Sequence, residues 1–406
     1  MDDPTAAATH AMPTPVLDEV RAIEVEMVAL RRLIHANPEL GFQEHQTSAL
    51  VARQLEGWGY TVHRGIGGTG VVATLRCGSG TKRLGLRADM DALPITELTG
   101  LPYASKTAGL MHACGHDGHT ATLLAVARVL GLTRAFDGTL NLIFQPAEEG
   151  LGGAQAMLDD GLFERFPCDA LFAFHNAPGF AAGQLGFRSG VVYTSSDTAI
   201  ITVHGRGGHG AMHHRAVDPI VAGAHLVLAL QSLVSREVDP NELSILTVGA
   251  FHAGDAPNVI PASAELRLTI RARSAAVREQ LRTRITAMAQ AQAAVHGASA
   301  EVDYRWRYPP TINALAETNF AREVALKWAG EGALIADLAP GAASDDFGLM
   351  LARVPGCYFT VGNGVGQAVG EGGCMVHSAG YDFNDRILPG TASYFVRLAQ
   401  AYLSRS

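Results

Sequence analysis

Residues 139–149 read Thr139-Leu140-Asn141-Leu142-Ile143-Phe144-Gln145-Pro146-Ala147-Glu148-Glu149. They form an apolar run, of the length of a buried strand, that ends in two adjacent carboxylates. Exposure to solvent is a poor explanation for two adjacent carboxylates at the end of such an apolar strand. If both are buried, they cannot both be ionised without nearby positive charge, which metal ions supply. The stretch therefore predicts a metal site at the end of a strand.

Strand and helix signals alternate on both sides of this stretch. Apolar runs predict strands, and apolar residues at helical spacing that end at Gly or Pro predict helices. We expect strands over 70–75, 84–88, 139–144 and 170–174, and helices over 16–36, 44–58, 119–130 and 152–158. This order favours an α/β fold with a mostly parallel sheet covered by helices.

Candidate functional residues follow three of the expected strands. They are Asp89 and Asp91 after the second strand, Glu148 and Glu149 after the third, and His175 after the fourth. In open α/β sheets, ligands bind beyond the carboxyl ends of the strands. We therefore expect these side chains to meet at one edge of the sheet.

The pattern changes after about residue 190. We expect a strand, a helix, two strands, a helix and a strand over 196–203, 219–234, 243–251, 264–272, 275–295 and 300–306. This order is typical of a ferredoxin-like unit. Residues 192–307 are therefore predicted to form an inserted α+β domain. Residues 1–191 and 308–406 are predicted to form one discontinuous catalytic domain.

Composition narrows the class of protein. The chain has 406 residues, 48% hydrophobic and 17% charged, which is typical of a globular protein with two domains. A net charge of −8 without a Lys/Arg run argues against nucleic-acid binding. Five scattered cysteines argue against a disulfide framework. No signal peptide is seen at the N-terminus and no apolar run approaches the roughly 20 residues of a membrane span. We therefore expect a cytoplasmic protein that does not contact a membrane.

Single histidines and cysteines have ordinary structural explanations as well. Cys114 and His116 offer a thiolate and an imidazole, which suit Zn²⁺ and similar metals, but a buried Cys is more often a small hydrophobe. His175 could equally be a histidine of the core, and His377 taken alone does not indicate a function. Asp91 could orient a metal-bound His or form a turn before a proline.

The remaining histidines and motifs of the sequence do not support a competing function. His112 and His119 are expected to be capping or satisfied polar residues. The glycine-rich segment 65–70 superficially resembles a dinucleotide loop, but it precedes a strand instead of following one and opening a helix. The sequence has no Walker loop, no Gly-x-Ser-x-Gly elbow and no His-Glu-x-x-His motif.

Several segments together resemble the M20 metallopeptidase family. They are Leu33–Glu44, Arg87–Pro94, Cys114–His119, Phe144–Glu149, Gly205–His209, Asn258–Pro261 and Ser344–Phe347. The pattern is most similar to the amidohydrolase branch, with its hippurate hydrolases, N-acyl-amino-acid amidohydrolases and plant auxin-conjugate hydrolases. The resemblance runs in order from about Val16 to the C-terminus.

The resemblance implies a binuclear metal centre. Its ligands would be Cys114, His116, Glu149, His175 and His377. Cys114 would take the bridging place that a carboxylate fills in other branches. Zn²⁺ suits these ligands, and Mn²⁺, Co²⁺ and Ni²⁺ stay open.

The resemblance also implies roles in catalysis and substrate binding. Glu148 would be the general base, and Asp91 would support the site from behind. His209 and Asn258 would contact substrate or oxyanion, and Arg271 would pair with the substrate carboxylate. The inserted domain would serve as a lid and form the interface of a homodimer or homotetramer.

Three positions depart from the family pattern. His213 stands where Pro is usual, Ala262 where Asp is usual, and Ser378 where Asn is usual. None removes a ligand or the base, so they bear on substrate preference and loop shape. His213 reads as a surface His in a loop or as an extra substrate contact.

These features predict a metal-dependent amidohydrolase of the aminoacylase type. It would cleave hippurate-like N-acyl amino acids to a carboxylic acid and a free amino acid. The alternatives are a dipeptidase or carboxypeptidase with the same site, a non-catalytic small-molecule-binding protein on the same fold, and a structural zinc protein. A structural site favours four close Cys or His ligands, whereas these are spread along the chain and include carboxylates.

Overall fold

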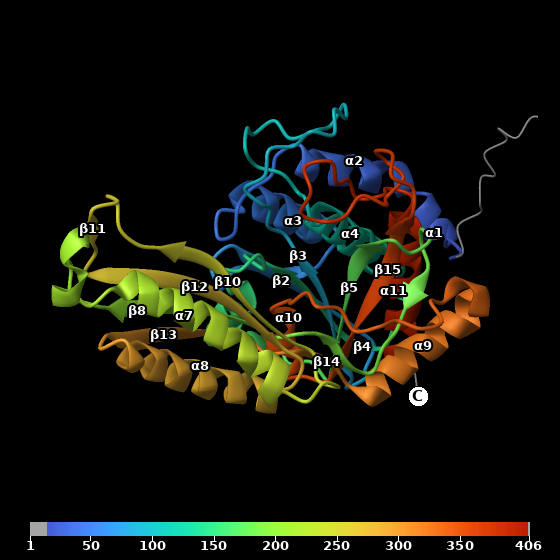
Figure 1. Cartoon of the computed structure of the whole chain (residues 1–406). Coiled ribbons are helices and arrows are strands. Elements are labelled where there is room, and N and C mark those ends of the chain that lie inside the picture. The colour runs from blue at the N-terminus through green and yellow to red at the C-terminus, as the bar shows by residue number, and fades with distance from the viewer. Residues whose placement is uncertain (1–13, 405–406) are drawn as a thin grey trace, which may run out of the picture. The chain divides into compact units, whose positions relative to one another are not determined.

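The computed structural model describes residues 14–404 (Figure 1), so residues 1–13 and 405–406 of the expected catalytic domain lie outside it. The chain divides into two compact units. Unit 1 is formed by residues up to 190, 312–339 and from 349 onward, and unit 2 by 191–311 and 340–348. Segment 340–348, assigned to the catalytic domain from sequence, groups with unit 2 because its backbone bonds to residues 192 and 194.

A seven-stranded sheet forms the centre of unit 1, in the order β1-β2-β4-β3-β5-β15-β6. Its strands are β1 (Thr61–Ile66), β2 (Gly70–Cys77), β3 (Arg83–Asp89), β4 (Gly138–Gln145), β5 (Ala170–Pro178), β6 (Leu185–Gly186) and β15 (Gly356–Gly364). The four central strands β4, β3, β5 and β15 are parallel, and the outer strands pair antiparallel. The central strands are almost wholly buried, which explains their continuous apolar sequences.

Helices cover this sheet. They are α1 (Asp18–Arg21), α2 (Glu24–His35), α3 (His45–Gly57), α4 (His116–Thr133), α5 (Gly153–Asp159), α6 (Leu162–Arg165), α9 (Leu315–Ala329) and α11 (Ile387–Tyr402). Helix α4 packs on β3 and β4, α3 on β1 and β2, and α9 and α11 on β15. The short η3 (Glu331–Ala333) follows α9, while β7 (Gly190–Tyr193), β14 (Thr311–Asn313) and α10 (Phe347–Leu351) lie where the chain passes between units.

Unit 2 is ferredoxin-like. Its main elements are β8 (Ser196–His204), α7 (Pro219–Ser232), β10 (Ser244–His252), β12 (Ser263–Ala272), α8 (Ala275–Val295) and β13 (Ser299–Tyr308). The sheet order is β10-β12-β8-β13, all antiparallel, and α7 and α8 pack together on this sheet. The expected β-α-β-β-α-β order is therefore confirmed. A loop region adds β9 (Gly208–His209), η1 (Gly210–Arg215) and β11 (Val259–Ile260), and η2 (Leu233–Glu237) continues α7.

Some boundaries differ from the sequence prediction. The helix expected over 16–36 is broken into α1 and α2, and the helix expected to begin at His119 begins at His116. Gly115, with φ of 96°, makes the left-handed turn into α4, and a Cβ there would lie 2.4 Å from the Asn176 side chain. The strand expected to end at residue 174 continues to 178, so His175 lies within β5.

One helical stretch corrects the expectation that no apolar run has the length of a membrane span. Residues Pro219–Glu237, which form α7 and η2, comprise 19 residues with a mean hydropathy of 1.3. Only 33% of the most apolar 18 residues of this stretch are buried. Since α7 packs on β8, β12 and α8, its inner face belongs to the core of unit 2, and its outer face exposes Ile220, Val221 and Leu228.

Candidate metal centre

Parallel strands of unit 1 bring the predicted carboxylates to one edge of the sheet. Asp91 follows the end of β3, and Glu148 and Glu149 follow the end of β4. His175 comes from the neighbouring strand β5. Because β4, β3 and β5 are adjacent and parallel, their carboxyl ends lie at the same edge.

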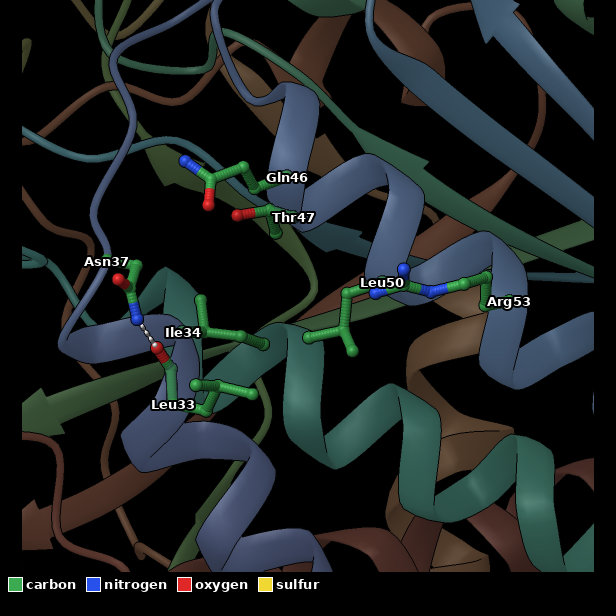
Figure 2. Close-up of a pocket in the computed structure, with 7 residues that line it drawn as sticks. All are labelled: Leu33, Ile34, Asn37, Gln46, Thr47, Leu50 and Arg53. Atoms are coloured by element: carbon green, nitrogen blue, oxygen red, sulfur yellow. Dashed lines mark hydrogen bonds between the residues drawn. The ribbon is translucent and has the colours of Figure 1, made fainter.

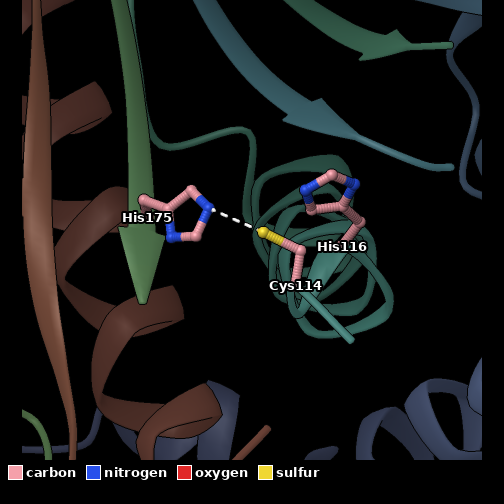
Figure 3. Close-up of side chains that lie close together, drawn as sticks. All are labelled: Cys114, His116 and His175. Atoms are coloured by element: carbon pink, nitrogen blue, oxygen red, sulfur yellow. Dashed lines mark hydrogen bonds between the residues drawn. The ribbon is translucent and has the colours of Figure 1, made fainter. Parts of the chain in front are cut away.

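The N-terminus of α4 carries the cysteine and the first histidine of the predicted ligand set. Cys114 precedes the helix and His116 is its first residue. The Sγ atom of Cys114 lies 3.4 Å from Nε2 of His175, and Figure 3 shows both side chains beside His116. The ligand atoms of these three residues lie within 4.8 Å of one another.

Two further clusters consist only of predicted ligands and the predicted base, and both share members with the first. One consists of Cys114, Glu149 and His377, in which Nε2 of His377 is 3.2 Å from Oε1 of Glu149. The other consists of His116, Glu148 and Glu149. The structure thus brings all five predicted ligands and the predicted base into one contiguous group, and Cys114 belongs to two clusters.

Asp91 holds two of these residues in place. Its Oδ1 atom is 3.1 Å and its carbonyl oxygen 2.9 Å from Nδ1 of His116. Its Oδ2 atom accepts a hydrogen bond from the backbone N–H of Glu149 at 2.9 Å. Nε2 of His116 therefore faces the cluster, as in a metal-bound imidazole whose other nitrogen is anchored.

An unpartnered buried nitrogen indicates that the cluster fits a metal. Among residues 14–404, Nε2 of His116 is buried and has no hydrogen-bond partner. Such atoms are rare in folded proteins because an unmet polar group costs free energy. With imidazole, thiolate and carboxylate donors, the residues present fit a transition-metal or zinc centre.

Burial and neighbouring groups shift the pKa values of three predicted ligands. Burial, together with nearby His119, lowers the pKa of His175 to about 3, which keeps its imidazole neutral. Burial and the Glu149 carboxylate raise the pKa of Cys114. Hydrogen bonds to Cys114 and Glu149 raise the pKa of His377 to about 10. Metal binding would displace the protons from Cys114 and His377, because ligands bind deprotonated.

The two other histidines of this region behave differently. Nδ1 of His119 is 2.6 Å from Oδ1 of Asp89, and its Nε2 is 2.7 Å from Oδ1 of Asn176. His112, expected to be a satisfied polar residue, is buried with neither ring nitrogen hydrogen-bonded within the described residues. Burial lowers the pKa of His112 to about 4, so its imidazole is neutral.

The predicted substrate-binding residues lie in unit 2. His209 in β9 pairs with Val259 in β11, and the carbonyl of Asn258 accepts a hydrogen bond from Gly210 at 2.8 Å, so His209 and Asn258 are close in the fold. Nδ1 of His209 accepts from the N–H of Ala211 at 3.1 Å, which leaves Nε2 to donate.

Arg271 lies apart from this loop, on β12. It donates a hydrogen bond to the hydroxyl of Ser344, and burial lowers its pKa. His213, one of the departures from the family pattern, is exposed in η1, with its ring 5.9 Å from that of His214.

A buried ion network behind the ligands was missed from the sequence. Arg31 on α2 pairs with Asp117 at 2.8 Å and with Asp382 at 2.5 Å, and Nδ1 of His35 is 2.8 Å from Asp117. Asp117 directly follows His116, so this network abuts the ligand segment. The available signal was the presence of charged residues on the apolar face of α2, among them His35 in the stretch Leu33–Glu44.

A pocket between α2 and α3 lies away from the cluster. It has a volume of about 220 Å³ and is lined by Leu33, Ile34, Asn37, Gln46, Thr47, Leu50 and Arg53 (Figure 2). None of these residues is a predicted site residue. The pocket therefore adds nothing to the chemistry of the candidate centre.

Comparisons with known proteins agree with this geometry. Residues 85–401 match the family model "Peptidase family M20/M25/M40". The chain is 42% identical to a hippurate hydrolase of Campylobacter jejuni, over 96% of this chain and 99% of that protein. It is 37% identical to an N-acetyl-L-cysteine deacetylase of Bacillus subtilis, over 83% and 80% of the two chains. The crystal structure of the Bacillus subtilis YXEP protein, described as a dinuclear metal binding peptidase from the M20 family, superimposes with a TM-score of 0.79 at 31% identity, over 94% and 99% of the two chains.

Proposed function

Because the chain belongs to peptidase family M20/M25/M40, we propose that it is a metal-dependent amidohydrolase that cleaves N-acyl amino acids to a carboxylic acid and a free amino acid. The observation that carries this proposal is the cluster of five ligand-type side chains with Glu148 beside them. The names of the two relatives, a hippurate hydrolase and an N-acetyl-L-cysteine deacetylase, support an acylated amino acid as the substrate class.

The cluster would hold two divalent cations. The ligands are Cys114, His116, Glu149, His175 and His377. Bound cations would lower the pKa of a water molecule and stabilise the negative charge that develops on the amide oxygen. Thiolate and imidazole favour Zn²⁺, with Mn²⁺, Co²⁺ and Ni²⁺ as competitors.

Glu148 acts as the general base in this proposal. The residue is 7% exposed, and its carboxylate lies in the cluster with His116 and Glu149, within reach of an attacking water. It takes a proton from that water and later returns it to the leaving amine. Asp91 keeps the imidazole of His116 and the backbone of Glu149 in position while this happens.

Unit 2 supplies the substrate contacts. Nε2–H of His209 donates to the oxyanion, because its Nδ1 is already engaged by the backbone of Ala211. Asn258 lies beside it. Arg271 pairs with the substrate carboxylate, for which a guanidinium is well shaped. Unit 2 would thus act as the lid of the site.

Unit 2 also forms the interface of a homodimer or homotetramer in this proposal. The outer face of α7 exposes Val221 (46%) and Leu228 (72%) beside the polar side chains of His225 and Gln231. Large apolar side chains gathered on one exposed face are typical of protein–protein contacts. We place the protein in the cytoplasm, since all five of its cysteines are free thiols.

The test uses metal-stripped protein with and without added Zn²⁺, Mn²⁺, Co²⁺ or Ni²⁺. Release of free amino acid is measured from N-benzoyl, N-acetyl and indole-acyl amino acids and from dipeptides. We expect metal-restored turnover of acylated substrates, and a fall in kcat of about 10²–10⁴-fold in Glu148→Gln with metal still bound.

The matched control is Glu164→Gln, an exposed carboxylate on α6, which should keep wild-type kcat. Turnover of dipeptides alone would replace the amidohydrolase by a peptidase. Stoichiometric metal binding without any turnover would favour a binding protein.

A further inference from the structure

Glu44 is a buried carboxylate that no cation neutralises. It is 0% exposed, and within residues 14–404 no Lys, Arg or His forms an ion pair with it. Its Oε1 atom accepts a hydrogen bond from the backbone N–H of Ala147 at 2.8 Å, and its Oε2 atom accepts one from the hydroxyl of Thr69. Burial raises the pKa of Glu44. Keeping a carboxyl group in such a place costs free energy, which these two hydrogen bonds offset.

The hydrogen bond to Ala147 fixes a strained turn. Ala147 has a φ of 51°, in the left-handed region that residues other than Gly and Asn avoid. Such a conformation costs free energy and persists only where its surroundings over-determine it. Here Glu44 holds the N–H of Ala147, and the N–H of Gly153 donates to the carbonyl of Ala147 at 3.0 Å.

Glu148 lies between two backbone N–H groups, each of which donates a hydrogen bond to a buried carboxylate. On one side Glu44 accepts from the N–H of Ala147. On the other side Asp91 accepts from the N–H of Glu149 at 2.9 Å. A buried carboxylate therefore fixes the backbone immediately before and immediately after the proposed base.

We propose that Glu44 is a positioning residue for Glu148. By holding the N–H of Ala147, it sets the direction in which the Glu148 carboxylate leaves the turn, as Asp91 does for Glu149. This inference rests on the proposed role of Glu148 as general base. A displacement of a reacting group by about 1 Å costs on the order of 10²-fold in rate, so the effect belongs in kcat and not in KM.

Two substitutions at position 44 separate geometry from charge. In Glu44→Gln the amide oxygen still accepts from Ala147, and the amide NH₂ donates to the hydroxyl oxygen of Thr69, which can rotate. We expect kcat close to wild type. In Glu44→Ala both hydrogen bonds are lost, and we expect kcat to fall about 10–100-fold with unchanged KM and unchanged metal content per chain.

Glu39→Ala is the matched control. Glu39 is in the same segment and accepts from the N–H groups of Gln46 and Thr47 at 3.0 and 2.9 Å, so it caps α3 without touching the turn. Its loss should lower the stability of the protein, because α3 loses a cap, and leave kcat unchanged. If Glu44→Ala does not fold, Thr69→Val removes one of the two hydrogen bonds of Glu44 and should lower kcat alone.

The outcomes are distinct. Four results would each overturn the positioning role, while turnover by wild type would still uphold the proposed function. They are a wild-type kcat in Glu44→Ala, an equal loss of kcat in Glu39→Ala, a Glu44→Gln variant as slow as Glu44→Ala, and a loss of metal from Glu44→Ala. Absence of turnover in metal-loaded wild type would overturn both, since Glu148 would have no base role to be positioned for.

Discussion

Asp91 touches two proposed metal ligands with its two carboxylate oxygens. Oδ1 faces Nδ1 of His116, and Oδ2 accepts from the backbone of Glu149. In Asp91→Asn one of these acceptors becomes an NH₂ group, which cannot accept. We expect metal affinity to fall about 10–100-fold, as is usual when a partner behind a metal ligand is lost. Competitive metal titration with a chromogenic chelator measures the change.

Asp137→Asn is the control for that prediction. Asp137 also accepts a backbone hydrogen bond, from Gly80 at 2.7 Å, but it lies outside the cluster. Its substitution should leave metal affinity unchanged. Equal affinities of wild type and Asp91→Asn would contradict the anchoring role of Asp91.

His35 makes stability depend on pH. Burial lowers its pKa, but the Asp117 carboxylate outweighs burial and raises the pKa from 6.5 to about 9. A raised pKa stabilises the folded state fully below pH 6.5, and this contribution is lost as pH rises to about 9. Its size is about 3 kcal/mol. Thermal unfolding at pH 6 and pH 9.5 should show wild type losing its advantage over His35→Gln, whereas exposed His45→Gln tracks wild type throughout.

At the residue scale, the sequence indicated the candidate ligands and Asp91 behind them, but not the further supports Glu44 and Arg31. Cys114, His116, Glu148 and Glu149 stand in short motifs, and the structure brings them together with His175 and His377. Glu44 acts on a residue 103 positions away, and Arg31 on one 351 positions away. The sequence around such a residue does not indicate its role, because that role depends on tertiary contacts.

At the element scale, Arg31 on α2 ties two ligand-bearing segments together. It pairs with Asp117 in α4 and with Asp382, which follows His377 along the chain. Arg31→Met would leave buried carboxylates unpaired, and we expect a loss of about 3–5 kcal/mol in the free energy of unfolding. Denaturant unfolding of the metal-loaded protein measures it.

The neighbouring Arg32 provides the comparison. Its side chain is 47% exposed and pairs with Asp385 at 2.8 Å at the surface. Because exposed ion pairs contribute about 0–1 kcal/mol, Arg32→Met should cost no more than that. Similar losses in the two variants would mean that burial of the Arg31 network adds nothing.

Most elements were predictable because their patterns are strong. The four expected strands around the site are β2, β3, β4 and β5, and the order of unit 2 was found in full. The break between α1 and α2 was missed, because residues 22 and 23 are apolar and continue the helical spacing. No element was predicted within residues 308–406, so β15, α9 and α11 were also missed.

At the scale of the whole molecule, the proposed assembly depends on the outer face of α7. Leu228 is 72% exposed there, so a charge at this position removes apolar area from an interface without disturbing the core. We expect wild type to have at least twice the chain mass of 42.7 kDa by light scattering, and Leu228→Glu to approach the single-chain mass.

Leu132→Glu is the control, since Leu132 is 70% exposed but lies in α4 of unit 1. Its mass should equal that of wild type. A monomeric wild type, or an unchanged mass in Leu228→Glu, would exclude assembly through α7.

The order of strands in unit 1 has a consequence for synthesis. Strands β5 and β6 are neighbours along the chain, yet β15 lies between them and pairs with both. A chain emerging from the ribosome must therefore make all of unit 2 before the strand that joins these two exists. His377 follows still later. Pairing over such sequence separations is slow, so the sheet and the proposed metal centre can be completed only after unit 2 has been made, and metal loading would follow the synthesis of unit 2.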